Sequence, residues 1–253
     1  MTNPNEPALV SAVLHEDGVA EIAMRDSQGK NAFSEPFVHQ LVAAAQNLGA
    51  DESVKAIVLT GLPDVFASGA PRELLVKLAR GEFVPSDIVL SKTLLDLPVP
   101  TISAMEGHAT GGGLALGLCA DMVLMARESR YGASFMNMGF TPGMGITRLL
   151  EHVLSPAMAH EMLYTGEFRR GRAFEQRSGV NYVLPRSEVR SKAFDLAASI
   201  AEKPRVALET LKRTLSLGRR QAFEATRTIE AMMHEITFSQ GAVRQRIEDE
   251  YVE

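Results

Sequence analysis

Two glycine-containing segments decide the fold of this chain: Phe-Ala-Ser-Gly-Ala at residues 66–70 and Gly-His-Ala-Thr-Gly-Gly-Gly-Leu at residues 107–114. Each follows a short apolar run that predicts a strand, at Ala56–Thr60 and at Thr101–Met105. The second segment also opens a predicted helix, whose first amides have no partner inside the helix. Because glycine has no Cβ, its amide can approach a ligand closely. One amide from each loop could therefore bind a carbonyl oxygen and stabilise it as it becomes anionic.

Around these loops, the first two thirds of the chain alternate predicted strands and helices. Apolar runs at residues 9–14 and Val19–Met24 predict an opening hairpin, and Met122–Ala126 predicts a further strand. A cap residue followed by proline at residues 34–36 predicts a helix start, and other helices are expected over Arg72–Ala79, residues 86–95 and residues 114–118. This alternation predicts an α/β fold with a parallel sheet.

The last third of the chain favours helix. Helical spacing occurs over Ile146–Val153 and over residues 157–163, 187–202, 206–217 and 221–238, with one strand candidate at residues 180–184. No linker or repeat separates the parts. We therefore expect an α/β core over residues 1–190 and a helical region over residues 191–253, packed on the core or on a neighbouring subunit.

Composition limits the class of protein. A chain of 253 residues with 45% apolar content can bury a full core. Residues 1–7 lack the features of a signal peptide, and the longest apolar window, residues 111–126, is shorter than the ~20 residues that span a bilayer. The single cysteine, Cys119, is expected to be a small buried side chain, which suits the cytoplasm. The net charge of −5 argues against nucleic-acid binding.

Charge and histidine patterns give two further expectations. Residues 203–220 carry six cations against Glu209 alone, which predicts either a solvated helix face or a docking site for an acidic partner or a phosphate. These cations are Lys203, Arg205, Lys212, Arg213, Arg219 and Arg220. No metal site is predicted, because the histidines show no metal-binding spacing. They are His15, His39, His108, His152, His160 and His234.

Ordered motifs through the first two thirds closely resemble the crotonase (enoyl-CoA hydratase/isomerase) superfamily. They are Ile57-Val58-Leu59-Thr60-Gly61, Phe66-Ala67-Ser68-Gly69, Pro98-Val99-Pro100, Gly107, Gly111-Gly112-Gly113, Cys119-Ala120-Asp121 and Gly139-Phe140-Thr141-Pro142-Gly143-Met144-Gly145. The resemblance implies a ClpP/crotonase-like ββα superhelix, with C-terminal helices that form a homotrimer and cover the active site. It also implies that the backbone N–H groups of Ser68 and Gly112 form an oxyanion hole for a thioester carbonyl. The residues expected to contact substrate are Gly69, Gly111, His108, Phe135 and Phe140.

The chain departs from the family at the two glutamates that handle water in a hydratase. The resemblance places them at Ala115 and Phe135. Without those carboxylates, hydration has no general acid or base. An oxyanion hole without them suits decarboxylation, because an apolar pocket disfavours the substrate carboxylate while the amides favour the delocalised anion. Double-bond isomerisation, thioester hydrolysis, hydration and thioester binding without catalysis are the alternatives.

Finer motifs resemble the decarboxylating homologues of polyketide β-branching cassettes, which contain a hydroxymethylglutaryl-type condensing enzyme. They are Phe66-Ala67-Ser68-Gly69, residues 137–145, Ala201-Glu202-Lys203-Pro204-Arg205 and residues 232–238. The resemblance implies conversion of a 3-methylglutaconyl group on an acyl carrier protein to a 3-methylcrotonyl-type group, without a cofactor beyond the phosphopantetheine or coenzyme A that carries it. Its implied partners are the carrier protein and the other cassette enzymes. Docking candidates are the cations of residues 203–220 and Arg169, Arg170 and Arg172.

Two side chains are expected by this resemblance to act in catalysis. Lys77 would pair with the departing carboxylate or help to protonate the dienolate, and otherwise it is an exposed helix lysine. His234 would donate a proton to carbon, since its ordinary pKa lies near neutrality, and otherwise it is a core histidine. His108, inside the glycine loop, is another candidate for the proton donor, although a histidine there more often orients the loop as a hydrogen-bond donor.

Overall fold

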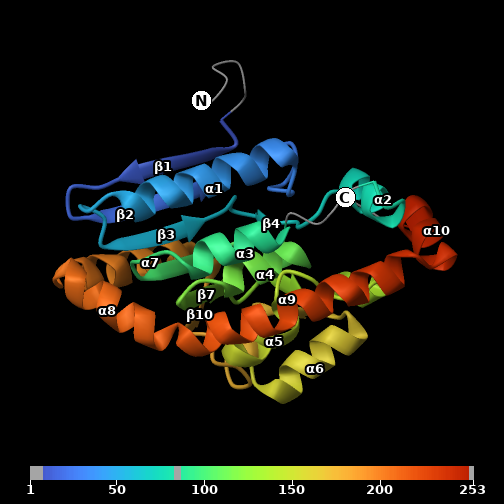
Figure 1. Cartoon of the computed structure of the whole chain (residues 1–253). Coiled ribbons are helices and arrows are strands. Elements are labelled where there is room, and N and C mark those ends of the chain that lie inside the picture. Colours follow the sequence, from blue (N-terminus) through green and yellow to red (C-terminus); the bar gives the residue numbers. More distant parts are fainter. Residues whose placement is uncertain (1–7, 83–86, 251–253) are drawn as a thin grey trace.

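A six-stranded sheet lies at the centre of the protein (Figure 1). The computed structural model describes residues 8–82 and 87–250. The strand order is β1-β2-β3-β5-β7-β10, with β1 and β2 antiparallel and the other pairs parallel. Strands β2, β3 and β5 are buried along their whole length, as expected for apolar runs covered on both faces. The strands are β1 Val10–Leu14, β2 Val19–Met24, β3 Ala56–Thr60, β5 Thr101–Met105, β7 Met122–Ala126 and β10 Tyr182–Leu184.

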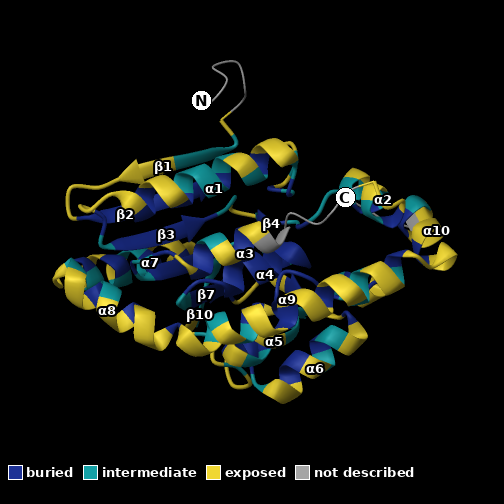
Figure 2. Ribbon diagram, in the orientation of Figure 1, coloured by how far each residue is buried: buried dark blue, intermediate teal, exposed yellow. Residues whose placement is uncertain are grey.

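Helices cover both faces of this sheet. Helix α1 (Glu35–Ala50) begins at the predicted cap, where the Ser34 side chain accepts a hydrogen bond from the Phe37 amide. Helix α7 (Arg186–Ala201) lays a stripe of small buried side chains on the opposite face, where β3, β5 and β7 contribute apolar residues. The larger core lies between the sheet and helices α3 (Asp87–Leu95), α4 (Gly112–Leu118) and α5 (Ile146–Val153) (Figure 2).

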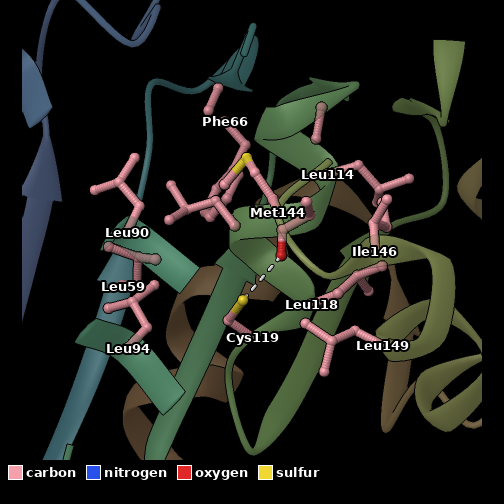
Figure 3. Close-up of a cluster of buried hydrophobic side chains, with 14 of the residues drawn as sticks. Leu59, Phe66, Leu90, Leu94, Leu114, Leu118, Cys119, Met144, Ile146 and Leu149 are labelled. Atoms are coloured by element: carbon pink, nitrogen blue, oxygen red, sulfur yellow. Dashed lines mark hydrogen bonds between the residues drawn. The ribbon is translucent and has the colours of Figure 1, made fainter. Parts of the chain in front are cut away.

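Cys119 lies in this larger core, as predicted (Figure 3). Its Sγ donates to the backbone oxygen of Ala115 at 3.3 Å. Burial raises the pKa of the thiol to about 11, so Cys119 is not a reactive thiolate.

A second, four-stranded sheet was not predicted from the sequence. It consists of β4 (Val65–Ala67), β6 (His108–Thr110), β8 (Arg130–Gly132) and β9 (Phe168–Arg170), in that order. Three-residue strands are too short to show an alternating pattern. Because β4 and β6 are parallel, the two glycine loops that follow them lie side by side.

The C-terminal helices begin with α7, so the predicted boundary between residues 190 and 191 falls inside that helix. Helix α9 crosses the molecule, and α10 packs against α2 (Figure 1). Helix α10 was not predicted. None of the described helices is long and apolar enough to cross a membrane. The remaining helices are α2 Arg72–Ala79, α6 Pro156–Thr165, α8 Arg205–Leu215, α9 Leu217–Phe238, α10 Gly241–Glu250 and the 3-10 turns η1 Ser134–Met138 and η2 Gly171–Phe174.

Both interpretations of the cations at residues 203–220 are wrong for Arg205, Lys212 and Arg219, whose side chains are mostly buried. Lys212 is buried and forms a 2.8 Å ion pair with Asp121, which also pairs with Arg219 at 2.5 Å. Arg205 pairs with Glu209 and donates to backbone oxygens at the end of α1. Burial alone would raise the pKa of Asp121, but Lys212 and Arg219 hold it below its usual range. These cations fasten α8 and α9 to the core instead of facing a partner.

Candidate active site

A cavity of about 500 Å³ opens beside the ends of β4 and β6. Its walls come from the segment before α1, from α2, from η1 and from the C-terminal end of α9. Ser68, Gly111 and Gly112 line it, and so do the predicted contact residues His108, Phe135 and Phe140. The tertiary structure thus gathers residues from six separate segments around the two glycine loops.

The two loops touch at Gly69. This residue has a φ of +84°, and a Cβ there would lie 2.9 Å from the Thr110 oxygen and 3.1 Å from the Gly112 nitrogen. A Cβ on Gly113 would lie 2.0 Å from the Ala67 oxygen. Only glycine allows such contact between a loop and a helix N-terminus. Gly69 itself does not line the cavity; it holds the loops together.

Two backbone amides at this junction have no acceptor among the described residues: those of Ser68 and Gly112. Gly112 is the first residue of α4, where helix geometry leaves the N–H without an internal partner. Buried amides are nearly always paired, so two unpaired amides at the edge of a cavity are suited to a ligand oxygen. The oxyanion hole that the resemblance implies would use these two amides.

None of the described residues that line the cavity is an aspartate or a glutamate. Ala115 is buried in α4, and Phe135 fills the second position at which a hydratase carries a carboxylate. The Phe135 ring lies beside the loop at Gly111 and Gly112, since a Cβ on Gly111 would lie 3.7 Å from that ring. The described lining therefore lacks the two carboxylates that a hydratase uses as acid and base.

A row of aromatic rings in mutual contact extends from the loop at Gly111 and Gly112 to α9. The Phe135 ring lies edge-on to Phe140 at 6.2 Å between centroids, and Phe140 stacks on Phe238 at 4.7 Å. The His234 ring lies edge-on to Phe238 at 5.4 Å. Phe238 was not predicted as a site residue, because its helical spacing is that of any core residue. The rings make this wall of the cavity apolar.

His234 lines the cavity, as predicted. Its Nε2 lies 2.8 Å from the backbone oxygen of Thr141, which can only accept, so Nε2 carries a proton. The Thr237 hydroxyl, one turn along α9, accepts a weaker hydrogen bond from the Thr141 amide at 3.3 Å. The imidazole is therefore held in one orientation at the edge of the apolar wall.

Lys77 does not lie where the resemblance suggested. Helix α2 turns Leu74, Leu75 and Leu78 toward the cavity, and Lys77 is exposed, outside the residues that line it. At 100° per residue, Lys77 lies roughly 100° around the helix from the middle of that leucine face. Contact of Lys77 with substrate stays a prediction from the resemblance, and the cavity lining does not include this residue.

His108 contacts its neighbouring strand as an acceptor, not as the donor that we expected. The Arg130 amide donates to Nδ1 of His108 at 2.8 Å. Burial lowers the pKa of the ring, and the nearby Arg186 and Arg130 lower it further. His108 is thus neutral at physiological pH, with its proton on Nε2.

Two charged residues at the site were missed from the sequence. Lys30 lines the cavity from a left-handed backbone position, with a φ of 52°. Glu230 is buried in α9 and accepts from the Gly145 amide at 2.6 Å, from the Thr147 amide at 3.1 Å and from the Thr147 hydroxyl at 2.5 Å. Neither lies in a motif that would reveal its role. In the part of the chain that is described, no group of three or more metal-binding side chains occurs.

Comparison with known proteins agrees with this geometry. The profile of the enoyl-CoA hydratase/isomerase family matches residues 15–253. The chain is 39% identical over 244 residues to the bacillaene synthase decarboxylase PksI of Bacillus subtilis, covering 96% of this chain and 98% of that protein.

Solved structures give the same relationship. A chain from a dehydratase/decarboxylase enzyme couple involved in polyketide β-branching superposes with a TM-score of 0.93 at 39% identity, covering 97% of this chain and all of that one (100%). The ECH2 decarboxylase domain of CurF from Lyngbya majuscula gives 0.91 at 37%, with 97% and 100% coverage. Methylmalonyl CoA decarboxylase, at 20% identity and a TM-score of 0.80, shares the fold.

Proposed function

Because this chain belongs to the enoyl-CoA hydratase/isomerase family, we propose that it is a decarboxylase of polyketide β-branching, which converts a 3-methylglutaconyl thioester to a 3-methylcrotonyl-type thioester. One observation carries the proposal: a cavity with two unpaired amides and no described carboxylate in its lining. The similarity to PksI and to the CurF domain, over nearly the whole chain, supports the same reaction.

Loss of CO₂ is the step that the oxyanion hole accelerates. The thioester oxygen accepts from the Ser68 and Gly112 amides. As the bond to the carboxylate breaks, its electron pair enters the conjugated system and forms a dienolate whose charge reaches that oxygen. Amides already aimed at the developing charge stabilise it by roughly 3 kcal/mol each. The apolar rings beside Gly111 strengthen this effect, because they exclude water.

Protonation of the dienolate at carbon completes the reaction. We assign this step to His234, whose ring is oriented by the Thr141 oxygen and packs on Phe238. An imidazolium has a suitable pKa for donating a proton near neutral pH. The neutral imidazole then takes up a proton from solvent, so the number of protons balances over the catalytic cycle.

The thioester is itself the electron sink, so the proposed reaction uses no cofactor beyond the phosphopantetheine or coenzyme A that carries the acyl group. The proposed partners are the acyl carrier protein and the cassette enzymes, since the relatives named above act in such pathways. A single cysteine that is buried suits the cytoplasm, where we place the enzyme.

We also propose a homotrimer assembled through α8 and α9. These helices expose large apolar side chains that a soluble monomer would rarely leave uncovered. They are Val206, Leu211, Leu215, Leu217, Ile229, Met232 and Ile236. Light scattering on the purified protein should give three times the mass of one chain, and a monomeric mass would reject this assembly.

Intact-mass analysis of a thioester substrate tests the reaction. Incubation with 3-methylglutaconyl-pantetheine should remove one CO₂ and leave the thioester intact. An unchanged mass with a shifted double bond would indicate isomerisation, loss of the acyl group would indicate hydrolysis, and gain of water would indicate hydration. Binding without any change in the ligand would identify a non-catalytic relative.

A further inference from the structure

The end of the cavity at His108 has no role in the steps above. His108 and Thr110 lie two residues apart on β6 and both line the cavity, because alternate residues of a strand face the same side. Thr110 leads directly into the oxyanion loop. A ligand with its carbonyl at Gly112 can therefore extend along this face of β6 and reach His108.

The chemistry that His108 offers to a ligand is fixed by β8. Since Nδ1 accepts from the Arg130 amide, a neutral ring carries its proton on Nε2. This Nε2 has no acceptor among the described residues. His108 thus offers an N–H donor at the cavity wall.

The surroundings of His108 favour an anion. Four charged groups act on it, from four different segments: Arg186 at the start of α7, Arg130 on β8, Arg170 on β9 and Asp64 before β4. Three of these four groups are cations and one is a carboxylate. This excess of cations attracts a negative ligand and, together with burial, keeps the ring neutral.

We propose that His108 binds the carboxylate that the substrate loses, and that it does so as a neutral hydrogen-bond donor. This rests on the proposed function, because the proposed substrate carries that group. Lys77 lies outside the cavity lining, and His234 is assigned to protonation at carbon, so we assign the carboxylate to the other imidazole of the lining, His108.

A neutral donor suits this reaction better than a cation. The carboxylate leaves as uncharged CO₂, so an ion pair with it would stabilise the substrate and be lost in the transition state. A single hydrogen bond to neutral His108 orients the breaking bond at a smaller cost. No proton passes to or from His108: the electron pair enters the dienolate, and the new proton reaches carbon from elsewhere.

Two unreactive thioesters that differ only in the carboxylate test this subsite. They are 3-methylglutaryl-pantetheine and isovaleryl-pantetheine, with affinities measured by calorimetry on the full chain. The unmodified protein should prefer the first. His108→Leu should reduce that preference about 10- to 100-fold, as expected for loss of a hydrogen bond to a charged group, and leave isovaleryl affinity nearly unchanged. His39→Leu, which removes an exposed histidine on α1, should change neither affinity.

A second variant and a pH series test the role of His108 independently of whether His108→Leu folds. His108→Asn retains an acceptor for the Arg130 amide and an N–H donor, so it should keep much of the preference even where His108→Leu fails to fold. In the unmodified protein, lowering the pH through the depressed pKa of His108 should tighten 3-methylglutaryl binding while kcat for decarboxylation falls.

The subsite is rejected if His108→Leu loses affinity equally for both thioesters. It is also rejected if this variant keeps the preference for the thioester that carries the carboxylate. These results are separate from the fate of the proposed function. An intact carboxylate preference without CO₂ release from 3-methylglutaconyl-pantetheine would reject decarboxylation and keep the subsite.

Discussion

Gly69 and Gly112 are glycines for different physical reasons. Gly69 has a left-handed backbone conformation and presses on the next loop. Gly112 has ordinary helical geometry, but a Cβ there would lie 2.8 Å from the Phe33 ring and 3.0 Å from the Met144 sulfur. A side chain at Gly112 would therefore collide with both residues at the cavity wall.

Comparison of two substitutions at Gly112 isolates its amide. Both Gly112→Ala and Gly112→Pro add atoms near Phe33 and Met144, but only proline removes the N–H, and proline is tolerated at the first position of a helix. We expect Gly112→Pro to lose about 100- to 1000-fold more kcat than Gly112→Ala, the usual effect of removing one oxyanion donor. Decarboxylation rates per folded protein give the comparison. Equal rates in the two variants would remove Gly112 from the hole.

At the scale of elements, one face of α9 fixes the loop that forms the cavity wall. Glu230 binds the start of α5, and His234 and Thr237 bind Thr141. The loop between these points holds Met144 at a φ of 63°, a strained value for a residue with a side chain. A single helix therefore sets both the proton-carrying imidazole and the residue that packs on Gly112.

Replacing Glu230 should loosen this wall. Glu230→Gln has one acceptor oxygen in place of two, so it cannot keep all three hydrogen bonds. We expect kcat to fall about tenfold with a smaller change in KM, since positioning matters most in the transition state. The matched control is Glu235→Gln, an exposed position on the same helix, which should behave as the unmodified protein. A loss of thermal stability with an unchanged kcat would show that Glu230 is only structural.

For the whole molecule, a small buried ionic cluster attaches the C-terminal helices to the core. Asp121 follows α4, while Lys212 and Arg219 come from α8 and α9. Burial lowers the pKa of Lys212 despite the attraction of Asp121, so the charged lysine is held at some cost. The cluster fixes where α9 lies, and hence where His234 meets the cavity, more than it adds to stability.

Replacing Asp121 and replacing Lys212 should reduce the free energy of unfolding by different amounts. Asp121→Asn leaves the buried Lys212 and the partly buried Arg219 without a carboxylate and should cost about 3 kcal/mol of unfolding free energy. Lys212→Met removes the buried charge and should cost less, because Arg219 still pairs with Asp121. Urea unfolding at neutral pH measures both. A larger loss in Lys212→Met would contradict this view of the cluster.

The same cluster predicts the direction of acid sensitivity. The pKa of Asp121 is lowered in the folded state, so the folded protein binds fewer protons there than the unfolded chain. Its stabilisation is present above about pH 4, the ordinary aspartate range, and is lost as the pH falls through the lowered pKa. Unfolding midpoints of the unmodified protein should therefore fall more steeply in acid than those of Asp121→Asn.

The sequence by itself determined the parts that depend on local signals. Continuous apolar runs predicted the central strands, a cap and proline predicted the start of α1, and motif resemblance identified the crotonase fold, the loops at Ser68 and Gly112 and the missing carboxylates at Ala115 and Phe135. The fold and the decarboxylase relationship are confirmed by the comparisons.

Only the tertiary structure decided which distant side chains meet. Three-residue strands carry no periodic signal, yet their pairing aligns the two glycine loops. A helix pattern shows that Lys77 and Leu78 share α2, but the packing of that helix decides which of them faces the cavity. Likewise, the sequence pattern predicts that Lys212 is a surface charge, whereas the fold brings it into an ion pair with Asp121. Local propensity cannot supply these results, because each depends on groups far apart in the chain brought together by core packing.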